Sequence, residues 1–186
     1  MIDRKIFSKI ISELTEKEKK HDQVLIISRE IIRDCANAIK DIHLGKLNSV
    51  EGQVKRIKEK LLKTRKQYAD FESNLFTANQ EYAEVALLYS ILKKEKISSP
   101  KNLGVDSITW LNGLADCTGE LRRQFLIALI DGQKSKAKHI FSVLEEIYEE
   151  LMTVKFGQSL VGPLKHKQDV LRSVVESCRS ELVKYS

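Results

Sequence analysis

The residues of this sequence best suited to chemistry are four carboxylates that occur as two pairs. They are Glu81 and Glu84, then Asp116 and Glu120. Each pair lies in a run of otherwise uncharged residues, 74–92 and 107–121. The members of a pair are three or four residues apart, so on a helix they project from the same face. No Lys or Arg stands three or four positions from Asp116, so its charge must be balanced by another part of the fold or by an ion.

These carboxylates offer the all-oxygen donor set that hard cations prefer. Mg²⁺, Mn²⁺ and Ca²⁺ take oxygen ligands, whereas zinc sites usually contain sulfur or imidazole. A di-iron bundle would need a Glu-x-x-His pair, and no His stands three residues after any of these acids. The alternative interpretation is structural: each acid points into solvent or pairs with a Lys of a neighbouring helix. The residues alone leave both interpretations open.

A stripe of basic residues is the second group that could bind a ligand. Arg29, Arg33, Lys40 and His43 fall on one face of a helix. A helix laid along a nucleic acid would use such a stripe to contact phosphate oxygens, which Arg binds in bidentate fashion. A solvated charged face explains the stripe equally well. The acids clustered at 145–150 are interpreted as a solvated face, because their surroundings are ordinarily charged.

The composition restricts the class of protein. The 186 residues carry a formal net charge of +6, with 31% charged and 42% hydrophobic residues and only 8 Gly and 2 Pro. This mixture is typical of a nearly all-helical protein, and its basic balance weakly favours an anionic partner. The three Cys are far apart without a CxxC pair, which indicates neither disulfides nor zinc and favours a reducing, cytoplasmic location. No segment predicts a secretion signal or a membrane span.

About seven helices are expected to position these side chains in one domain, residues 1–186. Apolar periodicity and breaker residues place the helices at 2–19, 22–44, 49–66, 70–94, 107–130, 134–155 and 164–182. Gly45 is expected to end the second helix, and Asp106 or Ser107 to cap the fifth. The first helix is amphipathic. The predicted fold class is therefore an all-α, single-domain multi-helix bundle.

Five segments of the chain resemble the translin superfamily. They are Ser28-Arg-Glu-Ile-Ile-Arg33, Ile42-His43, Gln80-Glu-Tyr-Ala-Glu84, Leu111-Asn-Gly-Leu-Ala-Asp-Cys-Thr-Gly-Glu-Leu-Arg-Arg123 and Lys165-His-Lys-Gln-Asp-Val-Leu-Arg172. The likeness covers nearly the whole chain, and its most specific part is the block 111–123. The compact chain without tails resembles the archaeal members. The resemblance implies a helical bundle of the translin type.

The acids separate two functional kinds within this superfamily. Translin binds RNA and single-stranded DNA, whereas translin-associated factor X (TRAX) is a Mg²⁺-dependent endoribonuclease subunit with both acidic pairs. Here Glu81 and Glu84 match the first pair, and Asp116 and Glu120 match the second, so the chain resembles TRAX. The resemblance implies that these four residues are catalytic and bind Mg²⁺, with Mn²⁺ as a substitute.

The resemblance also implies the partners of the protein. It predicts single-stranded or short RNA as substrate, single-stranded DNA as a further ligand, and a hollow homo-oligomer, with an octamer favoured, whose acids face the interior. Lys165-His-Lys167 departs from the Arg-rich run of many relatives at this place. The alternative function is that of a non-catalytic single-stranded RNA- and DNA-binding protein, like translin.

Overall fold

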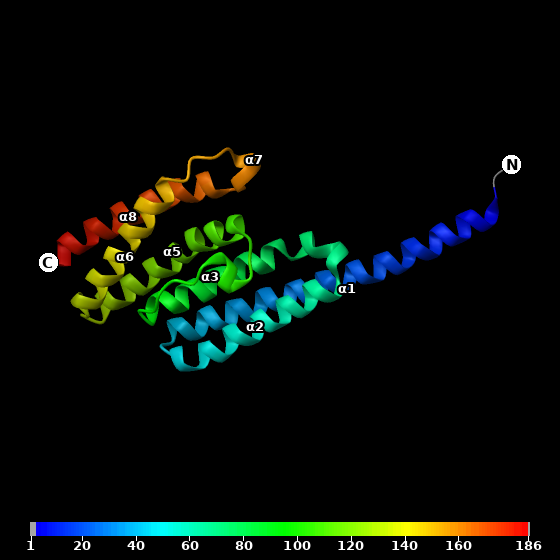
Figure 1. The fold of residues 1–186 in the computed structure, drawn as a ribbon. Coiled ribbons are helices and arrows are strands. Elements are labelled where there is room, and N and C mark those ends of the chain that lie inside the picture. Colours follow the sequence, from blue (N-terminus) through cyan, green and yellow to red (C-terminus); the bar gives the residue numbers. More distant parts are fainter. Residues whose placement is uncertain (1–2, 186) are drawn as a thin grey trace.

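The computed structural model describes residues 3–185, and within this range the chain is helical with no β-strand (Figure 1). The elements are α1 (Arg4–His43), α2 (Leu47–Gln67), the 3₁₀ helix η1 (Ala69–Leu75), α3 (Phe76–Leu92), α4 (Pro100–Leu103), α5 (Ser107–Ile130), α6 (Lys134–Met152), α7 (Gln158–Val161) and α8 (Leu164–Tyr185). The predicted all-α bundle is confirmed. Ile2, where the first expected helix begins, lies outside the described residues. None of the described helices is long and apolar enough to cross a membrane.

The first two expected helices are one continuous helix, α1, so the predicted break near residue 20 is wrong. The segment 16–22 is rich in charged residues but contains neither Gly nor Pro, and charge alone does not interrupt a helix. Asp3 caps the start by accepting a hydrogen bond from the backbone N–H of Lys5 (2.9 Å). The end is where it was predicted, with Gly45 in the left-handed region at φ 74°. The first part of α1 therefore projects beyond the bundle (Figure 1).

The helix expected at 70–94 begins instead as the 3₁₀ helix η1 and continues as α3. The segment contains Asp, Ser and Asn, residue types that disfavour the interior of an α-helix, and Phe71 within it has non-helical φ and ψ angles. Arg65 of α2 holds this region in place: its guanidinium donates to Asn79 Oδ1 at 2.6 Å and to the backbone carbonyl of Gly104. These bonds connect α2 both to α3 and to the segment that leads into α5.

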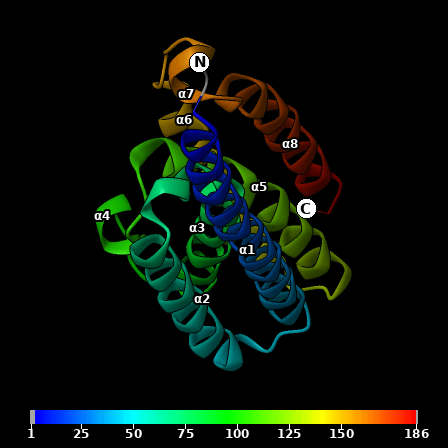
Figure 2. The same cartoon turned by 90° about the vertical axis from the view of Figure 1, so that its right-hand side faces the viewer.

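α3 is the central helix of the bundle. It packs against α1, α2 and α5, and α5 packs in turn against α6 and α8. The long helices form three layers, with α1 and α2 on one side, α3 and α5 in the middle, and α6 and α8 on the other side (Figures 1 and 2). Large side chains of α3 such as Tyr82, Leu87 and Leu88 are fully buried. Burial on several sides explains why α3 carries so few charges, because unpaired charges are costly to bury.

Gly113 of α5 allows α3 and α5 to approach each other closely. A Cβ atom at this position would lie 2.7 Å from Ala83 Cβ and 3.0 Å from the backbone nitrogen of Glu84. A side chain therefore fits only if one of the helices shifts. Gly119 lies on the same helix but faces open space. Apart from the nearby backbone of α5 itself, no described atom lies within 4 Å of a Cβ added there. The tight contact is thus specific to Gly113 and lies directly beside Glu84.

Gly113→Ala should destabilise the protein by about 1–3 kcal/mol, because the new methyl group forces α3 and α5 apart. Gly119→Ala is the matched control and should be neutral or stabilising by up to about 1 kcal/mol, since Ala has the higher helix propensity. Urea denaturation followed by circular dichroism gives the free energy of unfolding of both variants. Equal effects of the two substitutions would contradict the steric role of Gly113.

Candidate functional site

The packing of α3 on α5 brings the four predicted carboxylates into one region. Glu81 and Glu84 come from α3, Asp116 and Glu120 come from α5, and all four side chains are partly buried. The negative charges of the other three all act on Glu84. Two pairs that are separated in sequence therefore form one electrostatic cluster, which we call the carboxylate site.

Burial and mutual repulsion oppose ionisation at this site. Burial raises the pKa of Glu84 to about 8, and the charges of Asp116, Glu81 and Glu120 act in the same direction. Burial also raises the pKa of Glu81, and the charge of Asp116 adds to this shift. Lys167 opposes both shifts because its positive charge favours the ionised carboxylates. The excess negative charge favours either a proton on Glu84 or a cation in the cluster.

Asp116 is balanced by Lys167, which comes from α8. Lys167 Nζ donates a hydrogen bond to Asp116 Oδ2 at 2.7 Å, and Gln80 Nε2 of α3 donates to the same oxygen at 2.7 Å. Lys167 Nζ also lies 3.4 Å from the backbone carbonyl oxygen of Asn112. The sequence left two sources for the balancing charge, another part of the fold or an ion, and the structure shows the first of them. Three helices meet at this one carboxylate.

Glu120 is paired with His43, which comes from the end of α1. A short hydrogen bond joins His43 Nε2 to Glu120 Oε2, and Gln124 Nε2 lies 2.8 Å from His43 Nδ1. When the Gln124 amide donates to Nδ1, the Nε2–H of His43 is directed at the carboxylate. Only 6% of the His43 side chain is exposed. The prediction that His43 belongs to an exposed phosphate-binding stripe is therefore wrong, because its ring is turned into the carboxylate site.

The other three residues of the predicted stripe, Arg29, Arg33 and Lys40, are exposed on α1. We call these three residues the basic stripe. His43 follows Lys40 by about one helical turn and contacts Glu120. The basic stripe therefore leads along the surface of α1 to the carboxylate site, a continuity that the sequence pattern did not reveal.

The residues of the carboxylate site suit a hard divalent cation by their chemistry, but their positions are not those of a metal-bound site. Carboxylate oxygens are the preferred ligands of Mg²⁺ and Mn²⁺. Within residues 3–185, however, no three His, Cys, Asp or Glu side chains are placed so that they could hold a metal ion. Lys167 and His43 already occupy one oxygen each of Asp116 and Glu120. The second oxygen of each of these two carboxylates is left for a cation, and the four side chains would have to move closer together to bind one.

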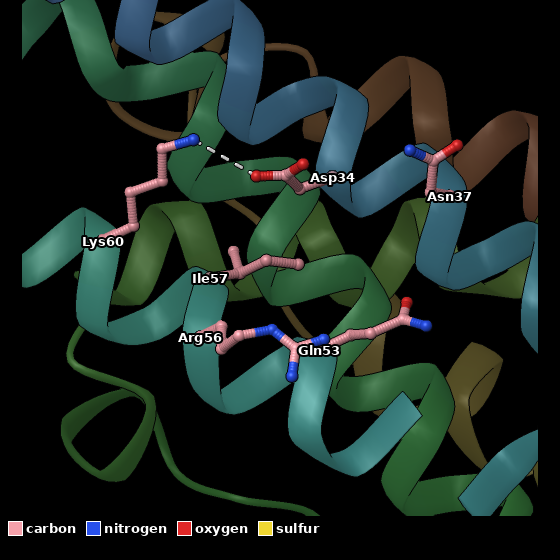
Figure 3. Close-up of a pocket in the computed structure, with 6 residues that line it drawn as sticks. All are labelled: Asp34, Asn37, Gln53, Arg56, Ile57 and Lys60. Carbon is pink, nitrogen blue, oxygen red and sulfur yellow. Dashed lines mark hydrogen bonds and ion pairs between the residues drawn. The ribbon is translucent and has the colours of Figure 1, made fainter. Parts of the chain in front are cut away.

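Two cavities border helices that carry these residues. One, of about 310 Å³, opens between α5 and α8 beside Asp116 and Lys167, with His166 and Val170 among its lining residues. The other, of about 390 Å³, lies between α1 and α2 (Figure 3). Its lining residues are Asp34, Asn37, Gln53, Arg56, Ile57 and Lys60. Lys60 bridges α2 to Glu30 and Asp34 of α1 at 3.0 and 3.2 Å, so the second cavity is bordered by ion pairs that hold these helices together. Of these two cavities, the first is the one lined by a residue of the carboxylate site, Asp116.

Three site residues had no local sequence signal: Gln80, Gln124 and Lys167. Lys167 is 51 residues from Asp116, and Gln124 is 81 residues from His43. Separations of this size cannot be read from helical periodicity. The only sequence indication for Lys167 was its place in the segment 165–172, one of those that resemble the translin superfamily.

Comparisons with known proteins agree with this architecture. Residues 3–185 match the Translin family. An uncharacterized protein of Methanocaldococcus jannaschii is 32% identical over 185 residues, covering 95% of this chain and 81% of that protein. The structure of AfC3PO in complex with duplex RNA is similar with a TM-score of 0.85 and 30% identity, covering 96% of this chain and 95% of that chain. The crystal structure of apo-NeC3PO matches with a TM-score of 0.87 and 24% identity over 100% of this chain and 99% of that chain, which supports the fold alone.

The stability of the metal-free protein should fall as the pH rises from the ordinary pKa of Glu84 to its higher pKa in the folded protein. Its folded pKa is about 8 and its ordinary value is 4.5, so between these values the folded state binds more protons than the unfolded state. Glu84→Gln removes this titration and should gain stability relative to the wild type above about pH 8, with little gain near pH 4.5. Urea denaturation in EDTA measures the difference, with Glu149→Gln, an exposed change on α6, as control. The same pH profile for the Glu84→Gln and wild-type proteins would disprove the burial of a proton at Glu84.

Proposed function

The chain belongs to the Translin family, and from this premise we propose that it is a Mg²⁺-dependent endoribonuclease that cleaves single-stranded or short RNA at the carboxylate site. The observation that carries the proposal is the convergence of all four acids between α3 and α5 in an environment with excess negative charge. Both acidic pairs that the resemblance assigns to the catalytic, TRAX-like kind are present in this one site. RNA as the ligand class is supported by the duplex RNA bound to the similar protein AfC3PO.

The side chains of the site have separable tasks in this proposal. Glu81, Glu84, Asp116 and Glu120 would hold the cation, and Glu84 would release its proton as the cation binds. When bound, a divalent cation supplies Lewis-acid polarisation of the phosphodiester and activation of a water molecule. Lys167 and His43 position Asp116 and Glu120 before binding. The Lys167 ammonium beside Asp116 would also attract a phosphate group of the RNA.

RNA binding is assigned to the basic stripe. Arg29, Arg33 and Lys40 are exposed along α1 and lead to the carboxylate site. Contacts to phosphate oxygens position a strand without reading its sequence. Because one chain holds both the stripe and the acids, a homo-oligomer suffices for activity. The octameric shell implied by the resemblance remains part of this proposal.

A second candidate function is non-catalytic binding of single-stranded RNA or DNA, as in translin. The ion pair of Asp116 with Lys167 and the hydrogen bond of Glu120 with His43 favour this candidate, since they satisfy two of the acids without a metal. The two functions differ in one respect that can be measured, which is cleavage of bound RNA when Mg²⁺ is added.

Asp116→Asn and Glu84→Gln should each lower the rate of RNA cleavage by about 100-fold or more, because each removes a ligand of the metal while preserving shape. The assay follows a labelled single-stranded RNA in Mg²⁺, in Mn²⁺ and in EDTA. Glu149→Gln on α6 is the control and should cleave at the wild-type rate. RNA binding, measured by fluorescence anisotropy, should persist in all variants. Binding without cleavage by the wild-type protein would favour the non-catalytic function.

Arg33→Glu should weaken RNA binding and make it less sensitive to salt. Each phosphate contact to a single strand contributes about 0.7 to the slope of log K against log salt concentration, so a lost contact lowers the slope by about that amount. Anisotropy titrations at several salt concentrations measure the slope. Lys138→Glu, an exposed change on α6, serves as control for net charge. Equal losses in the two variants would count against the basic stripe as the RNA contact.

A further inference from the structure

The N-terminal arm, residues 4–20 of α1, is an amphipathic helix without a packing partner within the described chain. Every residue of the arm is exposed, and the first buried residue of α1 is Val24. Five large apolar side chains lie on one face and are 45–61% exposed: Ile6, Phe7, Ile10, Ile11 and Leu14. A helix of this length gains little stability from its own hydrogen bonds in water. A contiguous apolar face on a projecting helix therefore indicates a contact surface.

The charges of the arm define the kind of surface that can cover it. Six basic and three acidic residues lie between Arg4 and Lys20. Lys9 and Lys17 fall along one edge of the apolar face with Glu13 between them, and the six basic and three acidic residues give the arm a net charge of +3. Two arms packed against each other would bring their positive charges together, which is unfavourable. The complementary partner is an apolar groove with an acidic edge.

Such a groove exists on the same protein, between α5 and α6. This α5–α6 groove has a volume of about 400 Å³ and a mostly apolar lining: Ile97, Trp110, Leu111, Leu114, Val143, Glu146, Ile147, Glu150, Leu151, Thr153 and Val154. Glu146 and Glu150 are exposed at its edge. The neighbouring Glu145 is turned the other way and pairs with Arg179 of α8 at 2.8 Å. The acids at 145–150 are therefore not one uniform solvated face, because two of them border an apolar groove.

We propose that the N-terminal arm of one copy of this chain docks in the α5–α6 groove of a second copy. The apolar face of the arm would cover Trp110, Leu111 and Val143, while Lys9 and Lys17 approach Glu146 and Glu150. The arm cannot reach its own groove by folding back, because α1 is one continuous helix that leads away from the bundle (Figure 1). The interface is separate from the carboxylate site, so it can be tested without measuring RNA cleavage.

Site-directed cross-linking tests the contact directly in the full-length protein. A chain with Lys17→Cys and Glu150→Cys, treated with a short bis-maleimide, should give covalent dimers and larger species on a denaturing gel. The native Cys35, Cys117 and Cys178 are buried, so they should react little. The matched control combines Lys17→Cys with Ile130→Cys, a position that is 81% exposed at the other end of α5. It should give at least ten-fold less cross-linked product. Equal yields from the two chains would overturn the proposal.

Sedimentation velocity supplies the second measurement. Ile10→Asp with Leu14→Asp should produce a smaller assembly than the wild type, whereas Ile26→Asp, which changes a residue 54% exposed on α1 outside the arm, should not. Circular dichroism verifies that both variants remain folded. A wild-type protein that sediments as a 21.3 kDa monomer, or an arm variant with an unchanged assembly, would overturn the proposal. A wild-type monomer that binds anionic phospholipid vesicles would also overturn it and assign the arm to a membrane surface.

Discussion

Repulsion among four carboxylates that are partly buried between two packed helices is the constraint on which the structure depends. Like charges in a poorly solvated region destabilise one another unless protons or cations offset them. The protein uses both means: burial and repulsion favour a proton on Glu84, and Lys167 forms an ion pair with Asp116. His43 provides a hydrogen bond to Glu120. Because Lys167 belongs to α8 and His43 to α1, both outer layers of the bundle are joined to the central one at this site.

The close packing of α3 and α5 makes this arrangement specific. Gly113 permits the backbone of the two helices to approach beside Glu84, and Arg65 connects α2 to Asn79 on α3 and to the segment before α5. Neither feature touches an oxygen of the four acids in the carboxylate site, since the carboxylate beside Arg65 is that of Glu72. Both determine how far apart the two acidic pairs lie, and hence how strongly they interact.

α1 links the three surfaces on which the proposed activities depend. Its end contributes His43 to the carboxylate site, its middle exposes the basic stripe, and its beginning is the N-terminal arm. A rigid helix keeps these surfaces at fixed separations, because the rise per residue is constant at about 1.5 Å. The N-terminal arm and the basic stripe would therefore keep a fixed distance from each other during assembly and RNA binding, although the two processes use different residues.

Local patterns in the sequence were sufficient for the fold class, most helix boundaries and the two acidic pairs. Apolar periodicity and caps such as Gly45 depend only on residues a few positions apart, and the pairing of Glu81 with Glu84 on one face has the same origin. The charged segment 16–22 predicts a break that α1 does not have, because charge alone does not interrupt a helix. The partners of the acids depended on tertiary structure, since Asp116 and Lys167 are 51 residues apart and Glu120 and His43 are 77 apart. Contacts over such separations form only after the helices pack. The same packing leaves the arm exposed and places two acids beside an apolar groove.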